Sequence, residues 1–140
     1  MGCVLRASGK DFNVDAFLRG SQLEPLTVWH VGEPRAPVSN PIGRQHQDSG
    51  MNVSVSLLNF SDLPGQIRDA RSFLQDNRSE ILRLKEFPGV ESIQLDFPIE
   101  DRDVALQSDV FKHELIALLG DLGIDLVVSR YPAPTSGLSS

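Results

Sequence analysis

The sequence lacks several features that would place a protein in a class at once. It contains a single cysteine, Cys3, so it cannot form an internal disulfide, and nothing in it indicates an oxidising compartment. It has no run of about 18 apolar residues, so no segment is expected to span a membrane. Its first residues show no basic start followed by an apolar stretch, so no secretory signal is expected. These absences favour a cytoplasmic protein.

Basic residues are scarce relative to acidic ones. The chain has 13 Lys and Arg against 19 Asp and Glu, a formal net charge of −6. Such a surface repels phosphate backbones and anionic headgroups, so neither nucleic acid nor a membrane is expected as a partner. The 3 histidines and the single cysteine are scattered at irregular spacing, and no phosphate-binding glycine motif is present. We therefore predict no metal site and no cofactor.

The remaining composition is that of a globular domain. The 140 residues are 40% hydrophobic and 23% charged, which is enough apolar material for one buried core. We expect a single domain over residues 1–131. The last residues, 132–140, are small, polar and proline-containing, and are expected to be disordered.

Hydrophobic periodicity predicts five strands and three helices. In "MNVSVSLL", residues 51–58, apolar residues alternate with Asn52, Ser54 and Ser56, which predicts a strand with one buried and one solvated face. The other expected strands are 3–7, 26–31, 91–99 and 124–131, and the expected helices are 13–20, 63–86 and 109–122. The long helix is expected to break near Asp76–Asn77, because both residues favour turns. Ser108 is expected to cap the last helix.

This order of elements predicts an α+β fold. Its first six elements match the ferredoxin-like, or split βαβ, pattern: an antiparallel sheet with helices on one face. The C-terminal helix and strand would be appended to that unit. An all-parallel sheet is disfavoured, because Ser54, Gln94 and Asp96 need a solvated face.

The stretch "HVGEPRAPVSNPIGRQHQDSG", residues 30–50, is the most conspicuous candidate site. Its prolines and glycines predict an irregular loop over 32–50, longer than most connections in compact domains. His46 and Asp48 are close enough in sequence for the carboxylate to orient an imidazole base. No partner nucleophile can be identified, so a solvated or partner-contacting loop is the favoured interpretation.

Trp29 is the second candidate. If Val28 faces the helices, Trp29 faces the open side of the sheet, where its expected neighbours are Arg6, Thr27, Ser54, Ser56, Gln94 and Asp96. Tryptophan is enriched at the hot spots of protein contacts. Contact with a partner, or with a second copy of the chain, and simple packing under the loop remain equal alternatives.

The chain resembles a bacterial family of small domains of unknown function. The resemblance rests on "FNVDAFLRGSQLEPLTVWHVGEP", residues 12–34, and "LLGDLGIDLVVSRY", residues 118–131. It implies a ferredoxin-like α+β fold, and the immunity role of some related small acidic domains implies one function. No catalytic residues are implied by the family.

Two functional hypotheses follow. The preferred one is a non-enzymatic protein-binding module, with an immunity role as one version. Its contact residues would be Trp29, the loop at 32–50, Glu33 and Asp96, and its acidic surface would suit a basic partner. The rival is a small-molecule-binding protein or enzyme that uses the same loop and the open sheet face. There Arg35 and Arg44 would hold an anion and His46, beside Asp48, would act as a base.

Overall fold

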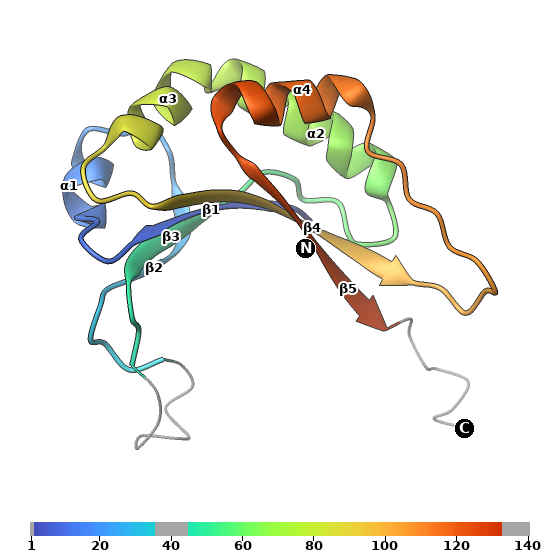
Figure 1. The fold of residues 1–140 in the computed structure, drawn as a ribbon, viewed down its shortest axis with the longest axis horizontal. Coiled ribbons are helices and arrows are strands. Elements are labelled where there is room, and N and C mark those ends of the chain that lie inside the picture. Colours follow the sequence, from blue (N-terminus) through green and yellow to red (C-terminus); the bar gives the residue numbers. More distant parts are fainter. Residues whose placement is uncertain (1, 36–44, 133–140) are drawn as a thin grey trace.

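The computed structural model describes residues 2–35 and 45–132, and it has a mixed α+β fold (Figure 1). The strands are β1 (Val4–Gly9), β2 (Pro25–Trp29), β3 (Ser49–Ser54), β4 (Ser92–Asp101) and β5 (Asp125–Pro132). The helices are α1 (Val14–Arg19), α2 (Leu63–Asp76), α3 (Arg78–Glu86) and α4 (His113–Leu122). The tail predicted to be disordered lies, apart from Pro132, outside the described residues.

The strands form one open sheet in the order β2-β3-β1-β4-β5. β1 pairs antiparallel with β3 and β4, and β2 pairs antiparallel with β3. β5 runs parallel to β4, so the sheet is mixed, and the antiparallel prediction describes only its first four strands. The connection explains this, because a helix that crosses over between neighbouring strands, as α4 does, joins them in parallel.

Helix boundaries follow from local hydrogen bonding. The Asp62 carboxylate caps α2 by accepting from the amide of Gly65 at 3.0 Å. At the other end, the Asn77 side-chain amide donates to the Phe73 carbonyl at 2.9 Å. The chain therefore forms two helices, α2 and α3, and the predicted break near Asp76–Asn77 is confirmed.

The predicted start of the last helix is wrong. α4 begins at His113, and residues 102–112 are an irregular connection. The Gln107 side chain organises this connection. It accepts from the Arg102 amide at 2.8 Å and donates to the Glu100 carbonyl at 2.9 Å. Ser108 lies beside this turn, too early in the chain to cap α4.

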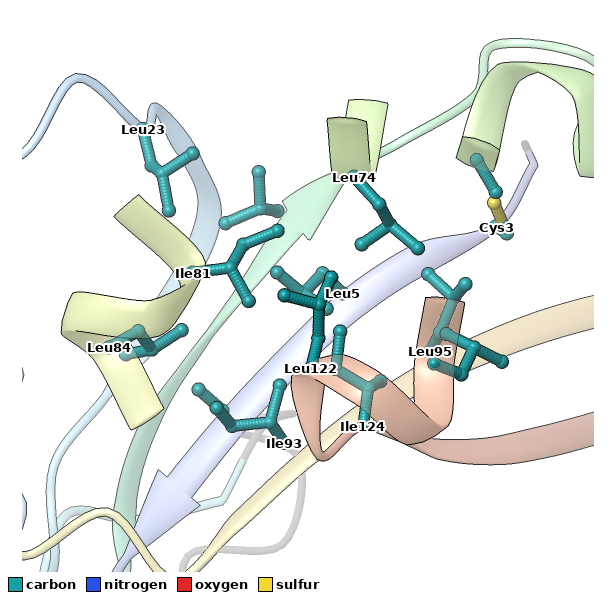
Figure 2. Close-up of a cluster of buried hydrophobic side chains, with 14 of the residues drawn as sticks. Cys3, Leu5, Leu23, Leu74, Ile81, Leu84, Ile93, Leu95, Leu122 and Ile124 are labelled. Carbon is teal, nitrogen blue, oxygen red and sulfur yellow. The ribbon is translucent and has the colours of Figure 1, made fainter. Parts of the chain in front are cut away.

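The core fills the space between one sheet face and the helices. Figure 2 shows Leu5, Ile93 and Leu95 of the sheet meeting Leu74 of α2 and Leu122 of α4, and all five are buried. Full burial of one such side chain contributes about 1.5–3 kcal/mol. This cluster holds the helices to one face, and no helix in the described part of the chain covers the other face, as Figure 1 shows.

Side chains on the open face follow strand alternation. Arg6 of β1 lies opposite Asn52 of β3 and Gln94 of β4, and all three point away from the helices. Ser56 was expected on this face, but it is buried and donates to Asp69 of α2 at 2.7 Å. β3 ends at Ser54, short of the predicted strand at 51–58, and the amides of Val55 and Ser56 both donate to the Cys3 carbonyl, at 3.0 and 3.3 Å.

Candidate functional site

The open sheet face contains a hollow of about 650 Å³ that reaches from β2 to β5. Its floor is formed by alternate residues of the three central strands, Val4, Arg6, Asn52, Asp96 and Pro98. Leu26 and Thr27 of β2 line one side, and Tyr131 of β5 lines the other. Asn59 and Phe60, from the segment between β3 and α2, line one end. The site is therefore built from all five strands.

Arg6 is the polar centre of this hollow. Its Nε–H donates to Asn52 Oδ1 at 3.1 Å and its Nη1 to Gln94 Oε1 at 3.4 Å. Its Nη2 donates to Asp96 Oδ2 at 3.3 Å, and Ser129 Oγ donates to the other oxygen of Asp96 at 2.7 Å. The guanidinium is thus held in place by side chains of β3 and β4, and its charge is matched by one carboxylate.

The polar groups left over around Arg6 are donors. Asn52, which lines the hollow, and Gln94, which lies beside Arg6 on β4, both present their amide oxygens to Arg6, so their NH₂ groups point elsewhere. Among the described residues neither NH₂ group has a hydrogen-bond partner, while both oxygens of Asp96 are occupied. The remaining N–H groups of Arg6 add to the same surplus. The centre of the hollow is therefore complementary to a ligand rich in hydrogen-bond acceptors.

An apolar rim surrounds this polar centre. Leu26 is 52% exposed and Tyr131 is 49% exposed, so both leave large apolar surface in contact with water. Phe60 meets Tyr131 edge to face, with ring centroids 6.0 Å apart. Aromatic side chains in this arrangement offer much contact area at low entropic cost, as recognition surfaces require.

Trp29 lies at the end of the open face and is held by the loop. Its indole lies over Gly50, where any Cβ would clash with the ring at 2.5 Å. The Nε1–H donates to Asp48 Oδ1 at 2.9 Å, and the ring stacks on His46 with centroids 5.9 Å apart. Trp29 is therefore half-buried by residues of its own chain, and the glycine in β3 makes this placement possible.

A charged cluster ties the base of the loop to α1. His30 Nδ1 lies 2.9 Å from Glu33 Oε1, and His30 Nε2 lies 2.8 Å from Asp15 Oδ2. Both contacts can be hydrogen bonds only if both ring nitrogens carry protons. The bonds to Glu33 and Asp15 raise the pKa of His30, and the bond from His30 lowers the pKa of Glu33.

The two ends of the loop pair with each other. The Gly32 amide donates to the His46 carbonyl at 2.9 Å, and the His46 amide donates to the Glu33 carbonyl at 2.8 Å. Pro34 and Gln45 form a further antiparallel bridge. The hairpin between β2 and β3 thus extends into the loop, and residues 36–44 lie outside the described residues.

The structure divides the predicted site residues into three groups. Asp96 lies in the hollow. Trp29, His46 and Asp48 lie together beside it, and no hydrogen bond joins His46 to Asp48 in the described part of the chain, because Asp48 is bonded to the indole.

Of the other predicted residues, Glu33 and Arg35 do not line the hollow. Glu33 belongs to the His30 cluster, Arg35 is exposed, and Arg44 lies outside the described residues. Leu26, Phe60 and Tyr131 were not predicted as site residues, and Asn52 was predicted only to lie on the solvated face of its strand. Strand alternation could have indicated Asn52, whereas Phe60 lies outside the strands and carries no such signal.

The remaining candidates for chemistry are not assembled for it. Cys3 is fully buried in the core. Burial, reinforced by the nearby charge of Asp69, raises the pKa of its thiol to about 12. Within residues 2–35 and 45–132, no three His, Cys, Asp or Glu side chains converge as a metal site would need. In the same residues, none of the helices combines the length and apolarity needed to cross a bilayer.

Comparison with known proteins gives a family but no function. The family model described as "Domain of unknown function (DUF4279)" matches residues 1–133. No curated protein and no solved structure matches the chain significantly. The resemblance to a family of unknown function is confirmed to this extent, and the chain belongs to the DUF4279 family.

Proposed function

We propose that this protein is a non-enzymatic binding module whose open sheet face receives a segment of a protein partner. The observation that carries the proposal is the composition of the hollow: unpartnered N–H donors at the centre and exposed apolar side chains at the rim. A protein interface typically has this mixture of anchoring aromatic residues and directed hydrogen bonds.

An extended polypeptide fits these donors. Backbone carbonyls are strong acceptors, and the Asn52 and Gln94 amides flank the guanidinium of Arg6 on neighbouring strands. Tyr131, Phe60 and Leu26 could then bury apolar side chains of the segment at the two sides of the hollow. Trp29, with His46 and Asp48, would extend the contact along the hairpin.

The same geometry gives little support to catalysis. The hollow has one cationic and one anionic lining residue among those described, Arg6 and Asp96, and they are paired with each other. Neither a histidine nor a cysteine lines it, and the Cys3 thiol lies on the helix side of the sheet in its protonated form. The groups present can orient and recognise a partner, whereas proton transfer would need a free acid or base.

We also propose that the fold is ferredoxin-like, because of the strand order in the sheet. β2, β3, β1 and β4 are antiparallel neighbours in the order expected for a ferredoxin-like unit, with α1 and α2–α3 as its two helical connections.

An immunity role, in which the acidic chain neutralises a basic toxin, is one version of the proposed function. A second copy of the chain is an alternative occupant of the face.

Site-specific crosslinking tests the proposal. A photoreactive amino acid at Thr27, which is exposed on the open face, should capture one defined protein in lysate of the producing cells. The same group at Ser79, exposed on α3, is the matched control and should not capture it. The adduct at Thr27 should disappear when Thr27-labelled protein also carries Leu26→Asp.

The outcomes separate the proposal from its alternatives. A homodimer adduct would assign the face to self-association. Equal adducts from Thr27 and Ser79, or none from either, would overturn the protein-binding function. A small ligand would then be the next candidate, because a hollow of about 650 Å³ falls in the size range of small-molecule sites.

A further inference from the structure

A second concave surface lies on the other side of Phe60. This groove, of about 500 Å³, runs between the N-terminal half of α2, the end of β4 and the connection at 102–112. Figure 1 shows that connection passing beside α2 on its way from β4 to α4. The apolar lining of the groove consists of Phe60, Leu63, Pro64, Ile67, Ile99 and Val110.

Four cationic side chains line the same groove. Arg68 and Arg71 are one helical turn apart on α2, and Arg102 and Lys112 belong to the opposite wall. This concentration is unexpected in a chain that carries 13 basic and 19 acidic residues. Like charges placed together repel one another, and an anion bound between them offsets this repulsion.

The acidic residues of the groove do not balance these cations. Asp109 pairs with Arg102 at 3.6 Å and accepts from Gln107 at 2.9 Å, so its charge is already matched. Glu100 also lines the groove, and its carboxylate offsets part of the charge of the other cations.

Glu114, on the first turn of α4, is the remaining acid close to Arg71 and Lys112. The pKa of its carboxyl is lowered chiefly by its own backbone N–H, and also by His113 and by those two cations. Within residues 2–35 and 45–132, Arg68, Arg71 and Lys112 form no ion pair. The two carboxylates of Glu100 and Glu114 near three cations leave a surplus of positive charge.

We infer that this groove binds an organic anion with an apolar body, and specifically a carboxylate. Arg68, Arg71 and Lys112 hold the carboxylate, because guanidinium groups donate paired hydrogen bonds to its two oxygens. The apolar body lies along Ile67 and Ile99 and covers Val110, which is 69% exposed without it. This site is separate from the proposed protein-binding hollow and does not depend on it.

Two sources could supply this chemistry. One is a free carboxylate with an alkyl or aryl body, and the other is an acidic residue beside an apolar one in a peptide. Octanoate serves as the probe for the first, and a blocked peptide of leucine and glutamate serves for the second. Octanol, which has the same apolar chain without the charge, tests whether the carboxylate is recognised.

The experiment is a titration followed by backbone amide NMR shifts and calorimetry on the full chain. Octanoate should shift the amides of α2 and of residues 109–112, and octanol should bind at least about tenfold more weakly. If the peptide binds more tightly than octanoate, the source is a polypeptide. The reverse order indicates a free carboxylate.

Charge-matched variants locate the site. Arg68→Gln with Arg71→Gln should weaken octanoate binding by about tenfold or more. Lys10→Gln with Arg19→Gln removes the same charge from exposed positions at the other end of the fold and should leave the affinity unchanged. Val110→Ser, at an exposed side chain, should weaken octanoate but not acetate.

Three results would overturn the inference. The first is equal weakening by both charge-loss pairs, which would indicate attraction by the overall field. The second is equal affinity for octanoate and octanol, which would indicate an apolar groove without anion recognition. The third is the absence of amide shifts in α2. Thr27→Arg, which fills the hollow on the open sheet face, should leave octanoate binding intact, so failure of one site is distinguishable from failure of the other.

Discussion

The hollow on the open sheet face and the groove beside α2 share the Phe60 side chain but arrange their charges in opposite ways. In the hollow, Arg6 is fixed by hydrogen bonds to three partners and neutralised by Asp96. In the groove, Arg68 and Arg71 project from one helix without such partners among the described residues.

This difference shows that an arginine at the centre of a concave surface can have two physical roles. A guanidinium whose charge is matched inside the fold contributes to structure and offers its remaining N–H groups to neutral acceptors. A guanidinium without a counter-charge keeps its charge available for an anion. The hollow is therefore suited to carbonyl groups and the groove to carboxylates.

Removing the counter-charge in the hollow should have the largest effect on stability. Asp96→Ala leaves Arg6 without its carboxylate and Ser129 without its acceptor, and should lower the free energy of unfolding by about 2–3 kcal/mol. Arg68→Gln in the groove should change it by no more than about 0.5 kcal/mol. Urea unfolding followed by circular dichroism measures both, and equal losses would remove the distinction between the two arginines.

Trp29→Ala should have the next largest effect, because Trp29 contributes to the open face beside the hollow but is only half-buried. A core aromatic costs about 3–5 kcal/mol when truncated, so about 1–2 kcal/mol is expected here. Trp29→Phe keeps a ring on His46 and loses only the bond to Asp48, so it should cost less. Circular dichroism during urea unfolding measures both variants. A chain that fails to fold with alanine at this position would make Trp29 a core residue.

Strand and helix patterns predicted most of the fold from the sequence. The alternation of Met51 and Val53 with Asn52 and Ser54 is observed, as is the break between α2 and α3. The pattern failed at Ser56, because β3 ends at Ser54 and the amides of Val55 and Ser56 both donate to the Cys3 carbonyl. A period of two residues carries no information about such a local irregularity.

The sites were harder to predict, because they depend on residues far apart in sequence. Asp96 was expected on the open face, but its pairing with Arg6 and Ser129 depends on the register of three strands. Arg71 and Lys112 are polar residues on separate elements, and sequence spacing cannot show that they line one groove. The loop at 32–50 was predicted as a site from its composition, whereas the hollow is lined mainly by residues of the strands.

Asp96→Asn should make the hollow resemble the groove, with a moderate effect on binding. The amide still occupies the site between Arg6 and Ser129, but the positive charge of Arg6 is no longer matched. The variant should therefore acquire octanoate binding within about tenfold of the groove's affinity. Amide shifts at Thr27 and Asn52 report the new site, and their absence would show that charge alone does not separate the two surfaces.

The His30 cluster should give the smallest effect, and it tests a third arrangement in which one cation lies between two carboxylates. Because the pKa of His30 is raised, its stabilising contribution is complete below its unfolded pKa of about 6.5 and is lost as the pH rises through the higher folded value. The pKa of Glu33 is lowered, so its contribution is present above its unfolded pKa and lost as the pH falls through the lower folded value. Between these limits both contacts of His30 are present, and the contact with Asp15 links the loop base to α1.

Glu33→Gln removes the largest cause of the His30 shift, so wild type and variant should differ most in thermal midpoint near about pH 6 and least near about pH 9. Differential scanning calorimetry across this range measures the difference. Glu86→Gln, at an exposed carboxylate of α3, is the matched control and should give a constant difference. A Glu33→Gln difference that is equally constant would mean that the bond between His30 and Glu33 does not contribute to the stability of the fold. The charge of His30 would then affect the electrostatic potential of the surrounding surface and not, through Glu33, the stability of the fold.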